Sequence, residues 1–113
     1  MSKTDDKIQN YTQNAKDLGL NIDSELLAKV TKGLGPSIHN KDAETVSCSD
    51  ASELDRVREN FLKKKLGLTN PDDELDASIK EVCQEMGTSN RNKYRAIFYT
   101  LLVNKFNKES IYA

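Results

Sequence analysis

Apolar residues recur at helical spacing along most of this chain, and this periodicity constrains the fold more than any other feature. It is clearest over residues 90–106, where apolar side chains follow the i, i+3, i+4, i+7 pattern of an amphipathic helix. This stripe consists of Tyr94, Ile97, Phe98, Leu101, Leu102 and Phe106. No segment alternates apolar and polar residues as a half-buried strand does. An all-α fold is therefore predicted.

Four further segments show helical periodicity, and most are bounded by start or stop signals. They cover residues 5–17, 24–34, 50–66 and 70–86. Gly67 and Gly87 follow the last two, and glycine is favoured just after a helix. Asn70 and Pro71 match the preference for an N-cap asparagine followed by proline at the first helical position. We expect a compact array of about five helices, forming a single domain over residues 1–113 with the first few residues frayed.

Charge is distributed unevenly along the chain, although the total is nearly balanced at a net charge of -1. From Thr88 onward there are five basic residues and one acidic residue, whereas the first 87 residues hold 12 basic and 17 acidic ones. Proteins that bind nucleic acid usually have a basic surplus, so the overall balance argues against that class. The simplest interpretation is that the basic end packs beside the acidic helices, because charged faces are commonly paired or solvated.

Three cations fall in the first turns of the helix predicted over residues 90–106. A helix N-terminus carries partial positive charge, so arginine and lysine are disfavoured there. An acidic neighbour in the fold, or a bound anion, would offset this cost. The sequence therefore predicts a non-enzymatic binding module whose surface, made of backbone N–H groups and arginine side chains, engages a small anion or an acidic partner protein. The candidate residues are Ser89, Asn90, Arg91, Lys93 and Arg95.

Patterns that would indicate an enzyme or a metal site are incomplete. Ser37, His39 and Asp42 lie close together, but there is no Gly-x-Ser-x-Gly turn, and His39 is the only histidine. Two cysteines and one histidine cannot complete a structural zinc site without a carboxylate. Acidic residues after Asn70 alternate as in a calcium loop, but Leu75 occupies the position where that loop needs glycine. We predict no catalytic residue, metal or cofactor.

Two alternatives stay open beside the binding module. The helices predicted on either side of Gly87, with basic residues opening the second, have the layout of a nucleic-acid-binding helix-turn-helix. Lys93 departs from that pattern, because the second helix of the motif normally buries an apolar residue at this position. A small enzyme that uses Cys48 or His39 is the other alternative.

Cys48 and Cys83 are predicted to be free thiols. The first seven residues lack the apolar core of a signal peptide, and no apolar run approaches the roughly 18 residues that span a membrane. Cysteines in a chain without a secretory signal indicate a reducing compartment, so we predict a cytoplasmic location and no membrane association. Cys83 belongs to a helical stripe, whereas Cys48 lies in the polar loop over residues 37–49. A loop of this length is either packed down or functional.

Several sequence blocks resemble one protein family. They are Lys29–Thr31, Gly35–Ile38, Val46–Asp50, Asn60–Leu68, Ser89–Ala96 and Lys108–Ser110. Over residues 26–112 the chain is similar to a small bacterial family whose domain has no known function, number 2853. The resemblance implies a small soluble helical bacterial protein and supplies no activity, substrate or catalytic residue.

Overall fold

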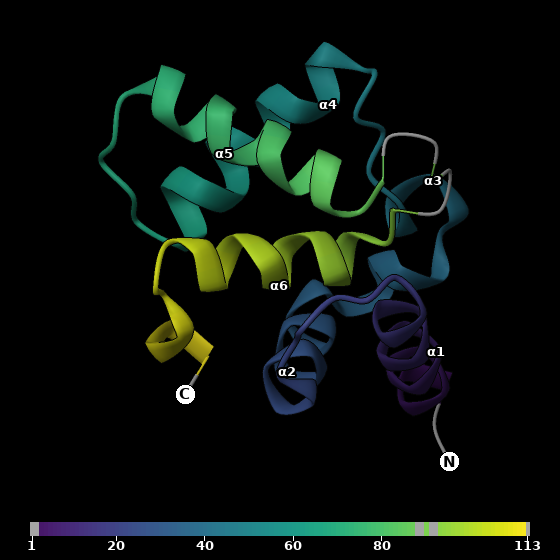
Figure 1. Ribbon diagram of the computed structural model, residues 1–113. Coiled ribbons are helices and arrows are strands. Elements are labelled where there is room, and N and C mark those ends of the chain that lie inside the picture. Colours follow the sequence, from purple (N-terminus) through teal and green to yellow (C-terminus); the bar gives the residue numbers. More distant parts are fainter. Residues whose placement is uncertain (1–2, 88–89, 91–92, 113) are drawn as a thin grey trace.

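The computed structural model describes residues 3–87, 90 and 93–112 (Figure 1). Nearly all of its regular structure is helical, which confirms the all-α prediction. The α-helices within these ranges are α1 (Lys3–Asp17), α2 (Ser24–Leu34), α3 (Lys41–Glu44), α4 (Ala51–Arg56), α5 (Asp72–Glu85) and α6 (Arg95–Lys105). A π-helical stretch, η2 (Val57–Lys65), continues α4, and two 3₁₀ turns are η1 (Gly35–His39) and η3 (Glu109–Tyr112).

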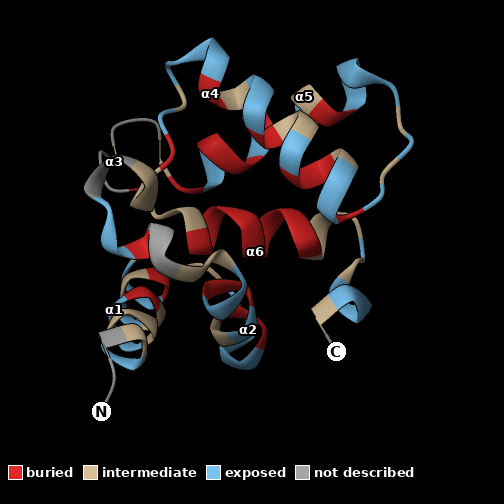
Figure 2. Cartoon of the chain, turned by 180° about the vertical axis from the view of Figure 1, so that it is seen from behind, coloured by how far each residue is buried: buried red, intermediate tan, exposed pale blue. Residues whose placement is uncertain are grey.

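Helix α6 is the centre of the molecule. Figure 1 shows α4 and α5 on one side of it and α1 and α2 on the other. All residues from 96 to 103 are buried, as the red ribbon of Figure 2 shows. The predicted apolar stripe is present, but the opposite face, with Tyr99 and Thr100, is covered as well. A helix that packs against neighbours on both sides is buried all round rather than amphipathic.

The start of α6 differs from the prediction. The expected helix began at residue 90, whereas α6 begins at Arg95 and Tyr94 is extended, with φ -60° and ψ 130°. A tertiary contact explains the difference. The Val46 N–H donates to the Lys93 carbonyl at 2.8 Å, and Thr45 pairs with Tyr94 in an isolated antiparallel bridge. These contacts hold the backbone before α6 in an extended conformation.

Aspartate side chains cap two of the helices, whereas the asparagine cap predicted for α5 is wrong. Asp23 and Asp50 accept backbone hydrogen bonds at the starts of α2 and α4, at 2.9 and 3.0 Å. At α5 the N-cap is Pro71 rather than Asn70. The Asn70 amide instead donates to the Glu74 carboxylate at 3.1 Å, which takes its side chain away from the backbone it was expected to cap.

The long polar loop of the sequence is partly helical. It contains η1 and the short helix α3, and its apolar residues Ile38 and Val46 are buried. Beyond α3 the chain runs irregularly from Thr45 to Asp50 before α4 begins. Within the described ranges, no helix combines the length and the apolar character that crossing a bilayer requires.

Candidate functional site

A cleft of about 760 Å³ lies between the irregular segment 45–49, helix α5 and the segment that precedes α6. Residue 54 of α4 completes its lining. This volume falls within the range of about 300–1,000 Å³ that is usual for small-molecule sites. The lining residues are Thr45, Val46, Ser47, Cys48, Ser49, Leu54, Lys80, Cys83, Gln84, Asn90 and Lys93.

Among the residues that the structure describes, the charged members of this lining are all basic. They are Lys80 and Lys93, and no described aspartate or glutamate joins them, although the whole chain has more acidic than basic residues. Lys80 is exposed on α5 and makes no ion pair with a described residue. Ser47 and Ser49 of the segment 45–49 also line the cleft, and their Oγ atoms lie 3.3 Å apart. The cleft thus combines positive charge with neutral hydrogen-bonding groups.

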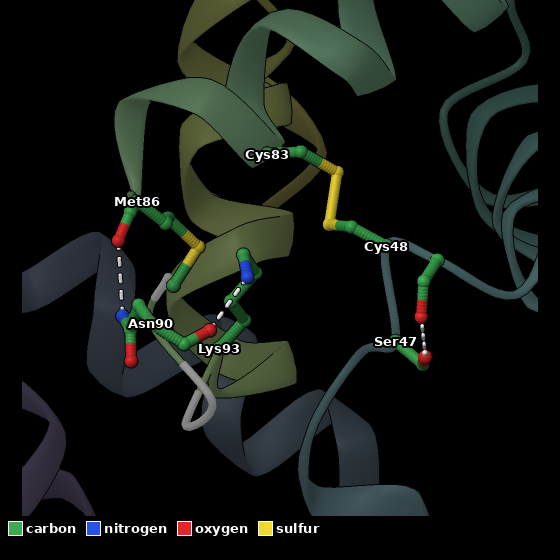
Figure 3. Close-up of a disulfide and its surroundings, with 7 residues drawn as sticks. Ser47, Cys48, Cys83, Met86, Asn90 and Lys93 are labelled. Carbon is green, nitrogen blue, oxygen red and sulfur yellow. Dashed lines mark hydrogen bonds between the residues drawn. A yellow bond between two sulfur atoms is a disulfide. The ribbon is translucent and has the colours of Figure 1, made fainter. Parts of the chain in front are cut away.

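Lys93 is unusual because it is a lysine with only 7% of its surface exposed. Its ammonium donates to the carbonyl of Asn90 at 2.6 Å, and the Asn90 side-chain amide donates to the Met86 carbonyl at 3.0 Å (Figure 3). An ammonium has three hydrogens to donate. The Lys93 ammonium makes no other hydrogen bond and no ion pair with a residue that the structure describes. Donor capacity and positive charge therefore remain on the cleft wall.

Cys48 and Cys83 form a disulfide, so the prediction of free thiols is wrong. The fold brings their Cα atoms to 6.1 Å, within the range that a disulfide needs, although the residues are 35 positions apart in sequence. The bond joins the segment 45–49 to α5 and lies in the cleft wall (Figure 3). Cys83 is 9% exposed, as its place in a helical stripe suggested, while Cys48 is partly exposed.

Arg95 lies behind the cleft and is paired inside the protein. Its guanidinium makes an ion pair with Glu53 and donates to the Tyr99 hydroxyl at 2.9 Å. It also donates to the carbonyl of Ala43 at 2.6 Å. Burial alone would lower the pKa of Arg95, but its interactions with Tyr99 and Glu53 raise it above the ordinary value. The charge is therefore permanent, and it holds the chain just before the segment 45–49 against α6.

The structure separates the five predicted site residues. Asn90 and Lys93 line the cleft, and Arg95 is directed toward Glu53 instead. Ser89 and Arg91 lie outside the described residues. Sequence reasoning missed Lys80 on the opposite wall, and it considered the segment 45–49 only through Cys48 and through the length of the polar loop. No local signal in the sequence places this loop beside Lys93.

The connection between α5 and α6 departs from a helix-turn-helix. Helix α5 ends at Glu85 and α6 begins at Arg95, whereas the motif joins its helices by about three or four residues. Among the described residues there is also no group of three or more His, Cys, Asp or Glu side chains that could hold a metal ion.

Comparison with protein families fits the resemblance seen in the sequence. A family model described as a protein of unknown function (DUF2853) matches residues 10–110. The chain belongs to this family. A search of the curated proteins finds no match to the chain. Membership in DUF2853 therefore brings no named activity, and the function of this member has to be argued from its own cleft.

Proposed function

We propose that this protein is a non-enzymatic binding module that holds a small carboxylate- or phosphate-bearing molecule in the cleft. The observation that carries the proposal is the charge of the described part of the lining, which has two lysines and no carboxylate in a chain that is acidic overall. A one-sign cleft with low-dielectric walls concentrates ligands of the opposite charge. Its volume suits a small molecule better than the surface of a folded partner protein.

Each part of the lining has a role in this proposal. Lys80, exposed at the cleft, attracts the anion, and Lys93 donates to it directly from the wall. Ser47 and Ser49 supply hydroxyl donors, and Asn90 supplies an amide. Charge-assisted hydrogen bonds of this kind are about twice as strong as neutral ones.

The remaining predicted site residues enter the proposal differently. Arg95 positions the chain that leads into the segment 45–49 rather than touching the ligand. Ser89 and Arg91 adjoin Asn90 in the chain and stay proposed as ligand-binding residues. We also propose that residues 1–113 act as one domain, because α6 packs against α1, α2, α3 and α5.

The proposal is tested by titrating the ¹⁵N-labelled protein with inorganic phosphate and with succinate at low salt. The amide signals of residues 45–49 and 90–94 are expected to shift together and to saturate. Lys80→Gln should weaken this binding, while Lys29→Gln removes an equally exposed lysine on α2, away from the cleft lining, and should not. If both variants lost the same amount of binding affinity, binding would depend only on the net charge of the protein, and the cleft would be refuted as the binding site.

A cytoplasmic location remains our proposal for this protein. The disulfide does not contradict it if the bond is reversible, because the disulfides found in the cytosol are usually transient or redox-sensing. Oxidation of Cys48 and Cys83 inside cells is measurable by differential alkylation. A cysteine pair that is fully and permanently oxidised in cells would contradict the cytoplasmic assignment.

A further inference from the structure

We propose that the Cys48–Cys83 disulfide is a reaction centre that undergoes exchange with a small thiol bearing carboxylates. The inference rests on the proposed function, because the lysines that would hold an anion in the cleft would also hold the carboxylates of such a thiol. Three features of the described residues carry it: both cysteines line the cleft, two lysines line the same cleft, and the bond anchors an irregular segment.

The exposure of the two cysteines decides which sulfur is attacked. Thiol–disulfide exchange requires access of a thiolate to one sulfur atom of the bond. Cys83 is 9% exposed on α5, whereas Cys48 is partly exposed in the segment 45–49 (Figure 3). The incoming thiolate therefore reaches the Cys48 sulfur, and the Cys83 sulfur is the leaving group.

The exchange balances without a further oxidant. The incoming thiol loses its proton, its sulfur bonds to Cys48 Sγ, and the electron pair of the Cys48–Cys83 bond leaves with Cys83 Sγ as a thiolate, which takes up a proton. A second molecule of the same thiol then attacks the sulfur of the first. A new S–S bond joins the two small molecules, and Cys48 is released as a thiolate that is protonated in turn. Two electrons pass to the protein, two small thiols become one disulfide, and the protein disulfide becomes two thiols.

The charge of the cleft favours this direction of cleavage. Lys80 precedes Cys83 by three residues on α5, and residues at this spacing share one helix face. Positive charge beside a sulfur stabilises its thiolate, and the thiolate is the form in which Cys83 leaves. Lys93 adds a second cation to the same cleft, and no aspartate or glutamate whose position the structure describes lines it. The lysines therefore serve both the incoming anionic thiol and the leaving thiolate.

Opening the bond would change one wall of the cleft. The hydrogen bonds within residues 47–50 are local, such as the Asp50 N–H to the Ser47 carbonyl at 3.2 Å. The attachments on either side do not involve sulfur: Val46 bonds to Lys93, and Asp50 caps α4. Reduction thus removes the covalent tie between α5 and this segment while its ends stay fixed. The proposed ligand site and the proposed redox site therefore share the same cleft wall.

The test uses the oxidised, full-length protein and three thiols: reduced glutathione, which carries two carboxylates, neutral 2-mercaptoethanol, and cationic cysteamine. Samples quenched with acid and alkylated are analysed by mass spectrometry, and each opening rate is divided by the thiolate concentration. Glutathione is expected to open the bond about threefold faster than the neutral thiol, the size expected of an exposed charge pair, and cysteamine more slowly. The preference should vanish at about 1 M salt, where the screening length falls to about 3 Å.

Variants locate the effect and the attacked sulfur. Lys80→Gln should abolish the preference for glutathione, whereas Lys29→Gln should retain it. In Cys83→Ser, oxidised glutathione should form a stable mixed disulfide with Cys48, while in Cys48→Ser the buried Cys83 should react far more slowly. Equal rates for all three thiols, or faster labelling of Cys83 than of Cys48, would overturn the proposal.

A non-reacting probe separates this inference from the proposed function. S-methylglutathione carries the same carboxylates but no thiol, and its binding is followed by the amide signals of the cleft. If it binds while glutathione shows no preferential exchange, the exchange proposal is wrong and the anion site stands. If neither it nor phosphate shifts these signals, the anion site is wrong, and the exchange proposal that depends on it fails too.

Discussion

Opening the Cys48–Cys83 bond should substantially lower the stability of the folded protein. The bond joins residues 35 positions apart, and cross-linking a loop of that length removes chain entropy from the unfolded state. The loop-entropy relation gives about 4 kcal/mol for this separation at room temperature. A domain of 113 residues shifts its melting temperature by roughly 4 °C per kcal/mol, so reduction should lower it by about 15 °C.

The measurement compares guanidinium unfolding of the oxidised protein with unfolding in excess dithiothreitol, followed by far-UV circular dichroism. The double variant Cys48→Ser/Cys83→Ala is the matched control, because it should resemble the reduced protein and ignore dithiothreitol. Alanine suits the second position because Cys83 is nearly buried among apolar residues and a hydroxyl there would need a partner.

Two results would refute this reasoning. A reduced protein that unfolds at the same guanidinium concentration as the oxidised one would show that the disulfide does not restrain the unfolded chain. A double variant that responds to dithiothreitol would show that the reductant acts elsewhere. A loss of far more than about 4 kcal/mol would point instead to collapse of the packing around α5, because it exceeds what loop closure supplies.

Three further predictions concern charged side chains. Arg95→Ala should lower the free energy of unfolding in guanidinium by about 3 kcal/mol, because it removes an ion-pair partner of the buried Glu53 carboxylate. Lys105→Ala breaks an exposed ion pair and should lower it by only about 0.5 kcal/mol. Equal losses in the two variants would contradict this prediction. Burial opposes ionisation of Glu44, but hydrogen bonds from Lys7 and Tyr11 lower the pKa of its carboxyl group. The contribution of the ionised carboxylate to folding stability is therefore full above pH 4.5 and is lost as the pH falls through the lower folded-state pKa. The stability difference between the native protein and Glu44→Gln should therefore shrink on acidification below pH 4.5, and a constant difference would count against it. Lys93→Met should change the free energy of unfolding by no more than about 1 kcal/mol, because an apolar side chain of similar volume replaces a buried charge. The same variant should abolish phosphate binding in the amide titration. A loss of several kcal/mol would show that the ammonium is paired.

The helices could be predicted from the sequence because their signal is local. Apolar spacing and caps such as Asp23 and Asp50 depend on residues within a turn or two of each other. The predicted helix boundaries are wrong where contacts with a segment distant in sequence override the local helical preference. Residues 90–94 have a helical pattern, but the contacts of Tyr94 with Thr45 and of Lys93 with Val46 keep the backbone at Tyr94 extended. No property of residues 90–94 alone reveals that partner.

Only a small part of the candidate site could be predicted from the sequence, for the same physical reason. Asn90 and Lys93 were selected because cations near a predicted helix start are locally anomalous. Lys80 is an ordinary exposed lysine in a helix and becomes interesting only beside the segment 45–49. The disulfide was missed because its two cysteines are far apart in sequence and were judged by expected compartment rather than by proximity. Long-range pairing is the information that spacing and composition lack.

The described cations of the basic C-terminal end include some that pair with carboxylates and one that is buried without a carboxylate partner. Arg95 and Lys105 have carboxylate partners, so for them the interpretation of internal pairing is correct. Lys93 is buried against a carbonyl and has no carboxylate partner among the described residues. A buried ammonium without a counter-charge is costly, and a bound anion would remove much of that cost. Ligand binding would then stabilise the fold in proportion to ligand concentration, and this gain should disappear in Lys93→Met but persist in Lys105→Ala. This difference between the two variants would show that the ligand stabilises the fold through Lys93 in the cleft.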